Sequence, residues 1–371
     1  MRPIVGPVTR GGEDAAVEAE RFKRVCPGAR VEARREPGQR HHRVFGQYVA
    51  AWKARASDPA VRYEGSSAGV LTALSTWFLE TGIVSTARAA RSDTLTPTRT
   101  VPVTIMSREQ ALAAAGSRYA PVAMLDGYRP EQNSLFVGKP CEAAALQQFH
   151  DAEGTAADDR PPILSFFCAG TPSQDSTDGL LDKLGMTPNV VQELRYRGRG
   201  WPGDFSATDA NGVTVRSPYA EAWGKHLGRG LPWRCKLCPD GTGGVADVSV
   251  GDFWEADEKG FPVFSEQEGT SVLIARTERG RRWVLAAVAD GFLEISPVDL
   301  DDVARIQPLQ VERKRTLLVR LLARLAAGRP VPSYAGFKLL RSLTWNPKLV
   351  AKAFLGTVER TVRKSNFRTP E

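Results

Sequence analysis

The sequence predicts a mixed α/β fold, in which a mixed sheet is flanked by helices and followed by a basic, mainly helical C-terminal extension. Short apolar runs typical of buried strands alternate with segments of helical periodicity. The runs 272–275 and 292–295 enclose a helical segment at 282–289, as in a β-α-β unit. The extension is distinct in charge, because residues 310–371 contain fourteen Lys and Arg but only three Asp and Glu.

Length and composition exclude several classes of protein. A chain of 371 residues can hold one large domain or two to three smaller ones. Its five cysteines, an odd number, do not suit a disulfide framework and favour a reducing compartment. No apolar segment typical of a secretion signal follows Met1, and no run of about eighteen apolar residues is present. We therefore expect a cytoplasmic protein.

The N-terminal third predicts an arm, a strand and a capped helix. Residues 1–44 are polar and are expected to form a loosely ordered arm. The apolar run 45–52 predicts a strand, and Ser66 or Ser67 is a good N-cap for the helix that continues to Gly82. The small residues at that helix start leave backbone N–H groups open to a phosphate, and a capped core helix without a ligand is the alternative.

The next segments alternate in the same way. Residues 84–106 predict strands, and Ser107 caps a helix that reaches Ala115. The loop that follows contains Ser117, Arg118 and Tyr119, which either face a cofactor or form an exposed loop.

The cysteines follow predicted strands or stand close together. The run 134–138 leads to Lys139 and Cys141 at a helix start, where the helix dipole favours a thiolate; a buried thiol beside a solvated lysine is the alternative. The run 163–167 leads to Cys168. Cys235 and Cys238 stand three positions apart in a turn bounded by Pro and Gly. Because sites in α/β proteins form at strand ends, we expect these four thiols to converge. Their spacing alone leaves an iron–sulfur cluster, zinc and packed thiols open.

A basic and aromatic segment precedes the cysteine pair. At 195–203 three arginines are interleaved with Tyr196 and Trp201. This pattern suits a flat, anionic ligand, and a solvated basic hairpin is the alternative.

Six motifs in the same order give the chain a family resemblance over roughly residues 45–310. They are GSSAGVLTAL, GSRY, FVGKPCEAAAL, SFFCAGTPS, RYRGRGWPG, and RCKLC followed by ADVSVGDFW. With these motifs the chain resembles the beta-subunit family of coenzyme F420 (deazaflavin) hydrogenases and dehydrogenases. That family also includes 7-hydroxymethyl chlorophyll a reductase and the cyanobacterial type of divinyl chlorophyllide reductase.

The resemblance implies a flavoprotein oxidoreductase with FAD and one 4Fe-4S cluster. It would pass electrons between a one-electron, ferredoxin-like carrier or partner redox subunit and a two-electron substrate, which is either coenzyme F420 or an organic molecule with a reducible bond. The implied cluster ligands are Cys141, Cys168, Cys235 and Cys238. The implied flavin contacts are Ser66, Ser67, Ala68, Gly69, Ser117, Arg118, Tyr119 and Lys139. The competing classes are a zinc-stabilised, non-redox binding protein and a pathway scaffold at the membrane surface.

Two departures from the family pattern accompany the resemblance. Ala68 stands where the family usually has a glycine, and the cysteines of an N-terminal ferredoxin-like segment are missing except for Cys26. With the resemblance, the expected organisation is an arm (1–44), an N-terminal flavin-binding region (45–130), a C-terminal iron–sulfur and flavin region (131–310) and a basic helical tail (311–371).

The tail carries an apolar helical face with arginines beside it. The residues of this face are Leu317, Leu318, Leu321, Leu322 and Leu325. Such a face suits an interfacial helix on anionic lipid, which would place the protein peripherally at the inner face of the membrane. It equally suits a helix packed on the protein body with a solvated basic side. Nucleic acid is an unlikely partner, since the basic and aromatic residues do not form a known module.

Overall fold

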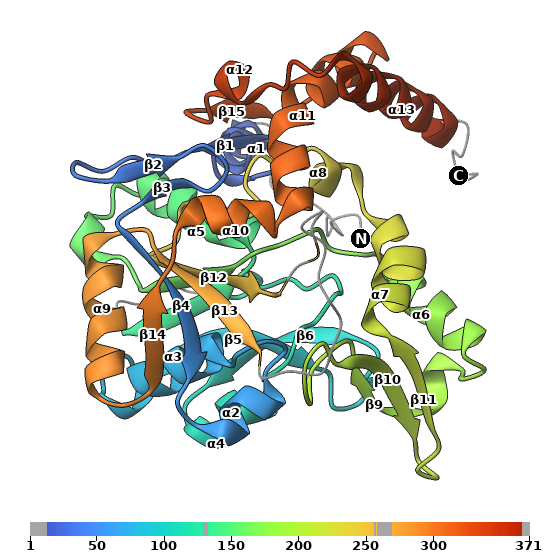
Figure 1. Ribbon diagram of the computed structural model, residues 1–371. Coiled ribbons are helices and arrows are strands. Elements are labelled where there is room, and N and C mark those ends of the chain that lie inside the picture. The colour runs from blue at the N-terminus through green and yellow to red at the C-terminus, as the bar shows by residue number, and fades with distance from the viewer. Residues whose placement is uncertain (1–12, 129–132, 256, 258–268, 366–371) are drawn as a thin grey trace.

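An eight-stranded mixed sheet forms the centre of the molecule (Figure 1). The computed structural model describes residues 13–128, 133–255, 257 and 269–365. In spatial order the strands are β14 (Leu293–Pro297), β4 (Ala50–Ala56), β13 (Thr270–Ala275), β12 (Val248–Phe253), β8 (Ile163–Phe166), β7 (Ser134–Gly138), β5 (Thr86–Ser92) and β6 (Thr100–Ile105). Strands β12, β8, β7 and β5 run parallel, and the remaining neighbours pair antiparallel. The mixed α/β prediction is therefore confirmed.

Apolar residues at helical spacing place four helices over one face of this sheet. These helices are α2 (Pro59–Glu64), α3 (Val70–Glu80), α4 (Arg108–Ala113) and α9 (Glu278–Ala289). The central helix, α3, buries Leu74, Trp77 and Phe78 against the sheet, and Ser107 caps α4 as expected. The predicted β-α-β unit is formed by β13, α9 and β14, with the earlier strand β4 lying between its two strands.

The opposite face is covered by α5 (Pro140–Ala152), α1 (Glu13–Val25) and α10 (Leu300–Arg305). Small residues on α5, Ala143 and Ala144, let this helix pack closely over Phe136 and Ile163 of the sheet. Phe45 fills the neighbouring part of the same layer with residues of β13 and α10. Both faces of the central strands are therefore buried, which explains their nearly continuous apolar sequence.

Residues 13–44, the described part of the N-terminal arm, are more ordered than the polar composition of the arm predicts. Besides α1 it contains β1 (Arg30–Glu32) and β2 (Arg40–His42), and β2 pairs with β3 (Gly46–Tyr48). Strand β1 pairs in parallel with β15 (Ser333–Ala335) of the tail. Gln148 of α5 donates to the carbonyl of Val25, and Arg34 pairs with Asp151 at 2.5 Å. These contacts join segments that lie far apart in the sequence, so the local composition of the arm does not predict them.

A smaller antiparallel sheet lies to one side of the central sheet (Figure 1). It consists of β9 (Val191–Arg195), β10 (Asp204–Asp209) and β11 (Thr214–Pro218), and it packs with α6 (Gln174–Lys183) around a separate apolar core. The chain then passes through α7 (Tyr219–Glu221) and two further helical turns to α8 (Trp233–Lys236), which carries Cys235.

The tail packs on the protein body. It forms α11 (Pro308–Ala326), α12 (Leu339–Ser342) and α13 (Pro347–Ser365), with α13 beside α11 (Figure 1). On the expected apolar face, Leu317 and Leu321 are buried against Leu237 in the cysteine loop, whereas Leu322 and Leu325 stay exposed. Over the described parts of the chain, every helix is too short or too polar to span a membrane.

Candidate functional site

The structure brings Cys141, Cys168, Cys235 and Cys238 together around one cavity. Cys141 lies in the first turn of α5, Cys168 follows β8, and the other two lie in and just after α8. Strands β7 and β8 are parallel neighbours, so the segments that follow them emerge at the same edge of the sheet. The loop after α8 then brings the cysteine pair to that edge.

Backbone contacts hold the cysteine-bearing loops against each other. The Cys168 amide donates to the carbonyl of Gly241 at 2.8 Å, and the Thr171 amide donates to Cys235 Sγ at 3.4 Å. Gly170 adopts a φ of 136°, and a Cβ atom there would lie 3.3 Å from the Cys235 Cβ and closer still to Leu231. The close approach of the two loops therefore requires a glycine.

Burial governs the charge of these thiols. It raises the pKa of Cys141 to about 12, with a further contribution from Glu142, and it also raises the pKa of Cys168 and Cys238. Burial therefore opposes the thiolate that the N-terminus of α5 favours, and in the protein without a metal it favours the buried thiol. A bound metal centre would reverse this balance, since its positive charge favours thiolate ligands.

Three cations lie around the cysteines, namely Arg234, Arg313 and Lys139. Their positive charge lowers the free-energy cost of negatively charged thiolates there. Arg234 hydrogen-bonds to Cys141, and although burial lowers its pKa, the Cys141 and Cys235 thiols raise it overall. Arg313 donates to the carbonyls of Cys168 and Ala169. Lys139 pairs with Glu142 at 2.6 Å and acts on Cys141 and Cys168 through its charge. In the described residues no three His, Cys, Asp or Glu side chains lie close enough to hold a single metal ion.

The predicted flavin contacts divide into two groups. Ser66 and Ser117 meet, since the Ser117 hydroxyl donates to Ser66 Oγ at 2.7 Å. Ser67 Oγ donates to the carbonyl of Thr270 in β13, and Ala68 is fully buried. The N-cap of α3 is Gly69, with a φ of 70° and no side-chain hydrogen bond, so the predicted cap at Ser66 or Ser67 is wrong. Gly69 has no side chain that could accept a hydrogen bond from the first N–H groups of α3.

Arg118, Tyr119 and Lys139 are engaged within the protein. The partly buried Arg118 guanidinium donates to the carbonyl oxygens of Pro97, Arg99 and Leu194. The Tyr119 ring packs on aromatic neighbours of the smaller sheet's core, and the Lys139 ammonium is paired with Glu142 as described above. We call residues 65–69, which contain Ser66 and Ser67, the serine loop.

Arg197 is a site residue that the sequence analysis did not single out within its basic segment. Its side chain is 2% exposed and pairs with Asp252 at 2.7 Å. Its guanidinium stacks on Trp201 at 4.4 Å. Within the described residues its buried Nη2 has no hydrogen-bond partner. Burial opposes the charge, but the nearby Asp252 raises the pKa, so Arg197 stays cationic.

This buried arginine shows that the 195–203 segment is not a solvated basic hairpin. Arg195 pairs with Glu64, and the Arg199 amide donates to the carbonyl of Tyr63 at 3.0 Å. The 195–203 segment therefore lies against the serine loop, and the charged side chain of Arg197 in this segment is buried. In the sequence, Arg alternates with Gly and aromatic residues over this segment, and this pattern suited a flat anionic ligand. The pattern did not indicate which of the three arginines is buried.

The sequence matches known proteins over most of its length. Two family profiles of the coenzyme F420 hydrogenase/dehydrogenase beta subunit match the chain, the N-terminal profile over residues 51–127 and the C-terminal profile over residues 131–301. The coenzyme F420 hydrogenase beta subunit of Methanococcus voltae is 24% identical, over 78% of this chain and 99% of that protein. The beta subunit from Methanothermobacter thermautotrophicus is 23% identical over 78% of this chain and 99% of its own length.

A solved structure shares the fold. One chain of the F420-reducing NiFe hydrogenase complex from Methanosarcina barkeri superposes with a TM-score of 0.55 and is 22% identical. The match covers 74% of this chain and 95% of that chain.

Proposed function

Since this chain belongs to the family of coenzyme F420 hydrogenase and dehydrogenase beta subunits, we propose that it is an oxidoreductase carrying FAD and one 4Fe-4S cluster. It exchanges single electrons with a ferredoxin-like carrier or a partner redox subunit. Its second substrate takes or gives two electrons, and is either coenzyme F420 or an organic molecule with a reducible bond. The observation that carries the proposal is the single cavity lined by four cysteines from separate elements.

The donor set suits the proposed cluster. A 4Fe-4S cluster takes four thiolates, and four of the five cysteines of this chain line the cavity. Arg234, Arg313 and Lys139 supply positive charge around these thiols, which stabilises the anionic cluster and shifts its reduction potential upward.

The serine loop suits the proposed flavin. A bound flavin exchanges electron pairs with its substrate and single electrons with an iron–sulfur centre. The start of α3 and the Ser66 hydroxyl, which accepts from Ser117, provide hydrogen-bond donors for phosphate oxygens. The Nη2 of Arg197, which has no hydrogen-bond partner among the described residues, adds a buried cationic donor, and in a site of low dielectric it favours an anionic group on the ligand.

Anaerobic purification with iron, acid-labile sulfide and flavin analysis tests the proposal. We expect about four iron and four sulfide per chain, in keeping with the cluster type, together with stoichiometric FAD. Replacing Cys141, Cys168, Cys235 or Cys238 individually by serine should remove the iron and sulfide. Cys26→Ser is the matched control, because Pro27 rather than Cys26 contributes to the cavity wall. Finding one zinc per chain and no acid-labile sulfide would contradict the electron-transfer role and indicate a structural metal site.

A further inference from the structure

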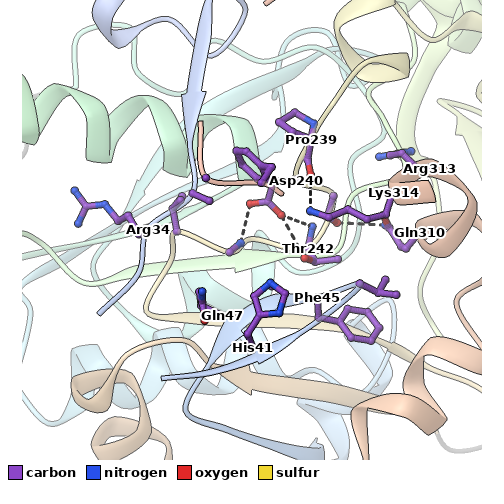
Figure 2. Close-up of a pocket in the computed structure, with 18 residues that line it drawn as sticks. Arg34, His41, Phe45, Gln47, Pro239, Asp240, Thr242, Gln310, Arg313 and Lys314 are labelled. Carbon is purple, nitrogen blue, oxygen red and sulfur yellow. Dashed lines mark hydrogen bonds between the residues drawn. The ribbon is translucent and has the colours of Figure 1, made fainter. Parts of the chain in front are cut away.

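A second pocket lies between the N-terminal arm and the tail (Figure 2). Its empty space measures about 650 Å³ including the open solvent at its mouth. Residues 33–47 form one wall and the start of α11 forms another, with the loop 239–245 as the floor. Both walls of this arm–tail pocket lie outside the segments matched by the family profiles.

The lining of the arm–tail pocket carries more positive than negative charge. Lys314 extends from α11 toward Pro239 and Asp240 (Figure 2) and makes one long hydrogen bond, 3.4 Å, to the Pro239 carbonyl. Asp240 acts on Lys314 through its charge, and the Lys314 ammonium also lies 5.0 Å from the centre of the Phe337 ring. Arg313 lies next to Lys314 and donates to the carbonyl oxygens of Cys168 and Ala169. A single carboxylate does not balance these two cations, so a bound anion would offset the remaining positive charge.

The carboxylate in the lining is already engaged. Both oxygens of Asp240 accept hydrogen bonds, one from the Thr242 amide at 2.8 Å and the other from the Gly244 amide at 2.7 Å. Its role is to shape the floor loop, as in a turn closed by an aspartate side chain.

Behind the floor lies another cation without a carboxylate partner among the described residues. Arg276 is 1% exposed and donates to Ser249 Oγ and to the carbonyl oxygens of Phe45, Gln47 and Thr242. All of these acceptors are neutral, so its charge adds to the positive potential of the pocket. Arg34 does not contribute in the same way, since Asp151 pairs with it at the outer rim.

The lining also contains an unsatisfied polar atom. Gln47 Oε1 is buried and, within the described residues, has no hydrogen-bond partner. A buried acceptor left in this state costs on the order of 1–3 kcal/mol, and a ligand that donates to it would recover that energy. The pocket therefore offers cations for an oxyanion and an acceptor for a hydroxyl group.

We propose that the arm–tail pocket binds a small ligand that combines a phosphate or carboxylate group with a hydroxyl donor, with the anionic group on Lys314 and the hydroxyl on Gln47. Arg313, Pro239 and Asp240 also line the cysteine cavity, so a ligand here sits one side chain away from the cysteines. Binding does not require the cysteines to hold a cluster, and the site can be tested whether or not the redox proposal holds.

Isothermal titration calorimetry of the purified full chain with inorganic phosphate and with malate tests this site. Hydrogen phosphate and malate each carry the anionic group and the hydroxyl donor, and the two arms separate phosphate from carboxylate chemistry. We expect one of them to bind with one site per chain and to raise the melting temperature. Absence of binding by both at millimolar concentration would overturn the proposal.

Two variants separate binding from a structural role. Lys314→Met should weaken binding at least tenfold, while Arg315→Met, which removes the same charge from an exposed neighbour on α11, should bind like the wild type. The melting temperature of ligand-free Lys314→Met should change little, because its hydrogen bond to Pro239 is long and Asp240 keeps its two backbone hydrogen bonds. A lower melting temperature together with unchanged affinity would assign Lys314 a structural role and refute the site. Gln47→Met should also weaken binding and provides a second route if the first variant does not fold.

Discussion

At the scale of single residues, Arg197 is a buried cation in the segment that lies against the serine loop. It keeps its charge through Asp252, stacks on Trp201 and leaves one guanidinium nitrogen without a partner among the described residues. Gly69 also lies at this site, but a Cβ atom there would come within 2.6 Å of the Val61 carbonyl oxygen. Substitution of Gly69 would therefore disturb packing with or without a ligand, and Arg197 is the better residue for testing the flavin site.

Replacing Arg197 with lysine should release the proposed flavin while the cluster remains. Lysine retains the charge for Asp252 but cannot supply the planar set of donors, so we expect FAD affinity to fall at least tenfold. Flavin fluorescence after desalting and the iron content measure the two cofactors separately. Arg199→Lys, at an exposed position of the same segment, is the control. Stoichiometric FAD in the Arg197→Lys protein would exclude this arginine from the flavin site.

Protonation of His150 should lower the free energy of unfolding in mild acid. Burial, followed by the charges of Arg160 and Arg34, lowers the pKa of this histidine in the folded protein. The unfolded chain binds the proton more readily, so this contribution to stability is present above about pH 6.5 and is lost as the pH falls through that range. Urea unfolding at several pH values should show a shallower loss of stability for His150→Gln. An identical slope would show that other groups dominate.

At the scale of elements, α11 links the extension to the cysteine cavity. Its apolar side packs on Leu237, and its Arg313 holds the carbonyls of Cys168 and Ala169. The Tyr334 hydroxyl, from β15 at the far end of the same connection, donates to the Leu237 carbonyl. The helix and this strand therefore support the loop between Cys235 and Cys238 from outside the segments that the family profiles match.

Removing the buried anchor of α11 should destabilise the whole chain. Leu317 is 0% exposed, so Leu317→Ala leaves a cavity that costs about 2–5 kcal/mol of unfolding free energy. Leu322 lies on the same helix but is 52% exposed, and Leu322→Ala should change stability by no more than about 0.5 kcal/mol. Urea denaturation of both variants measures the difference. Equal effects would show that the tail does not pack on the body in solution as it does here.

At the scale of the whole molecule, the N-terminal arm and the tail form one layer through the pairing of β1 with β15. This layer covers one side of the cysteine cavity, to which Pro27, Val31 and Pro332 contribute. If the cavity holds the proposed cluster, this cover would limit the contact of the cluster with solvent and oxygen.

We expect the tail to act as a packed layer rather than as a membrane anchor. Two of the five leucines proposed for lipid contact are buried in the protein, which reduces the apolar area available to a membrane. The chain should therefore remain in the supernatant with anionic vesicles at about 0.15 M salt, where surface electrostatics are screened. Co-sedimentation at that salt concentration, lost on replacing the exposed Trp345 with serine, would instead support the lipid-binding hypothesis.

Local patterns in the sequence determined the alternation of strands and helices, the basic character of the tail and the position of Cys141 and Cys168 just after parallel strands. These features depend on residues close together in the chain, so periodicity and caps report them. Tertiary structure alone decided that the polar arm pairs with the tail and that Arg197 is buried. It also decided that burial raises the pKa of the Cys141 thiol and that Lys314 faces the arm–tail pocket. Burial and charge depend on residues far apart in sequence, and a local pattern carries no information about which of them meet.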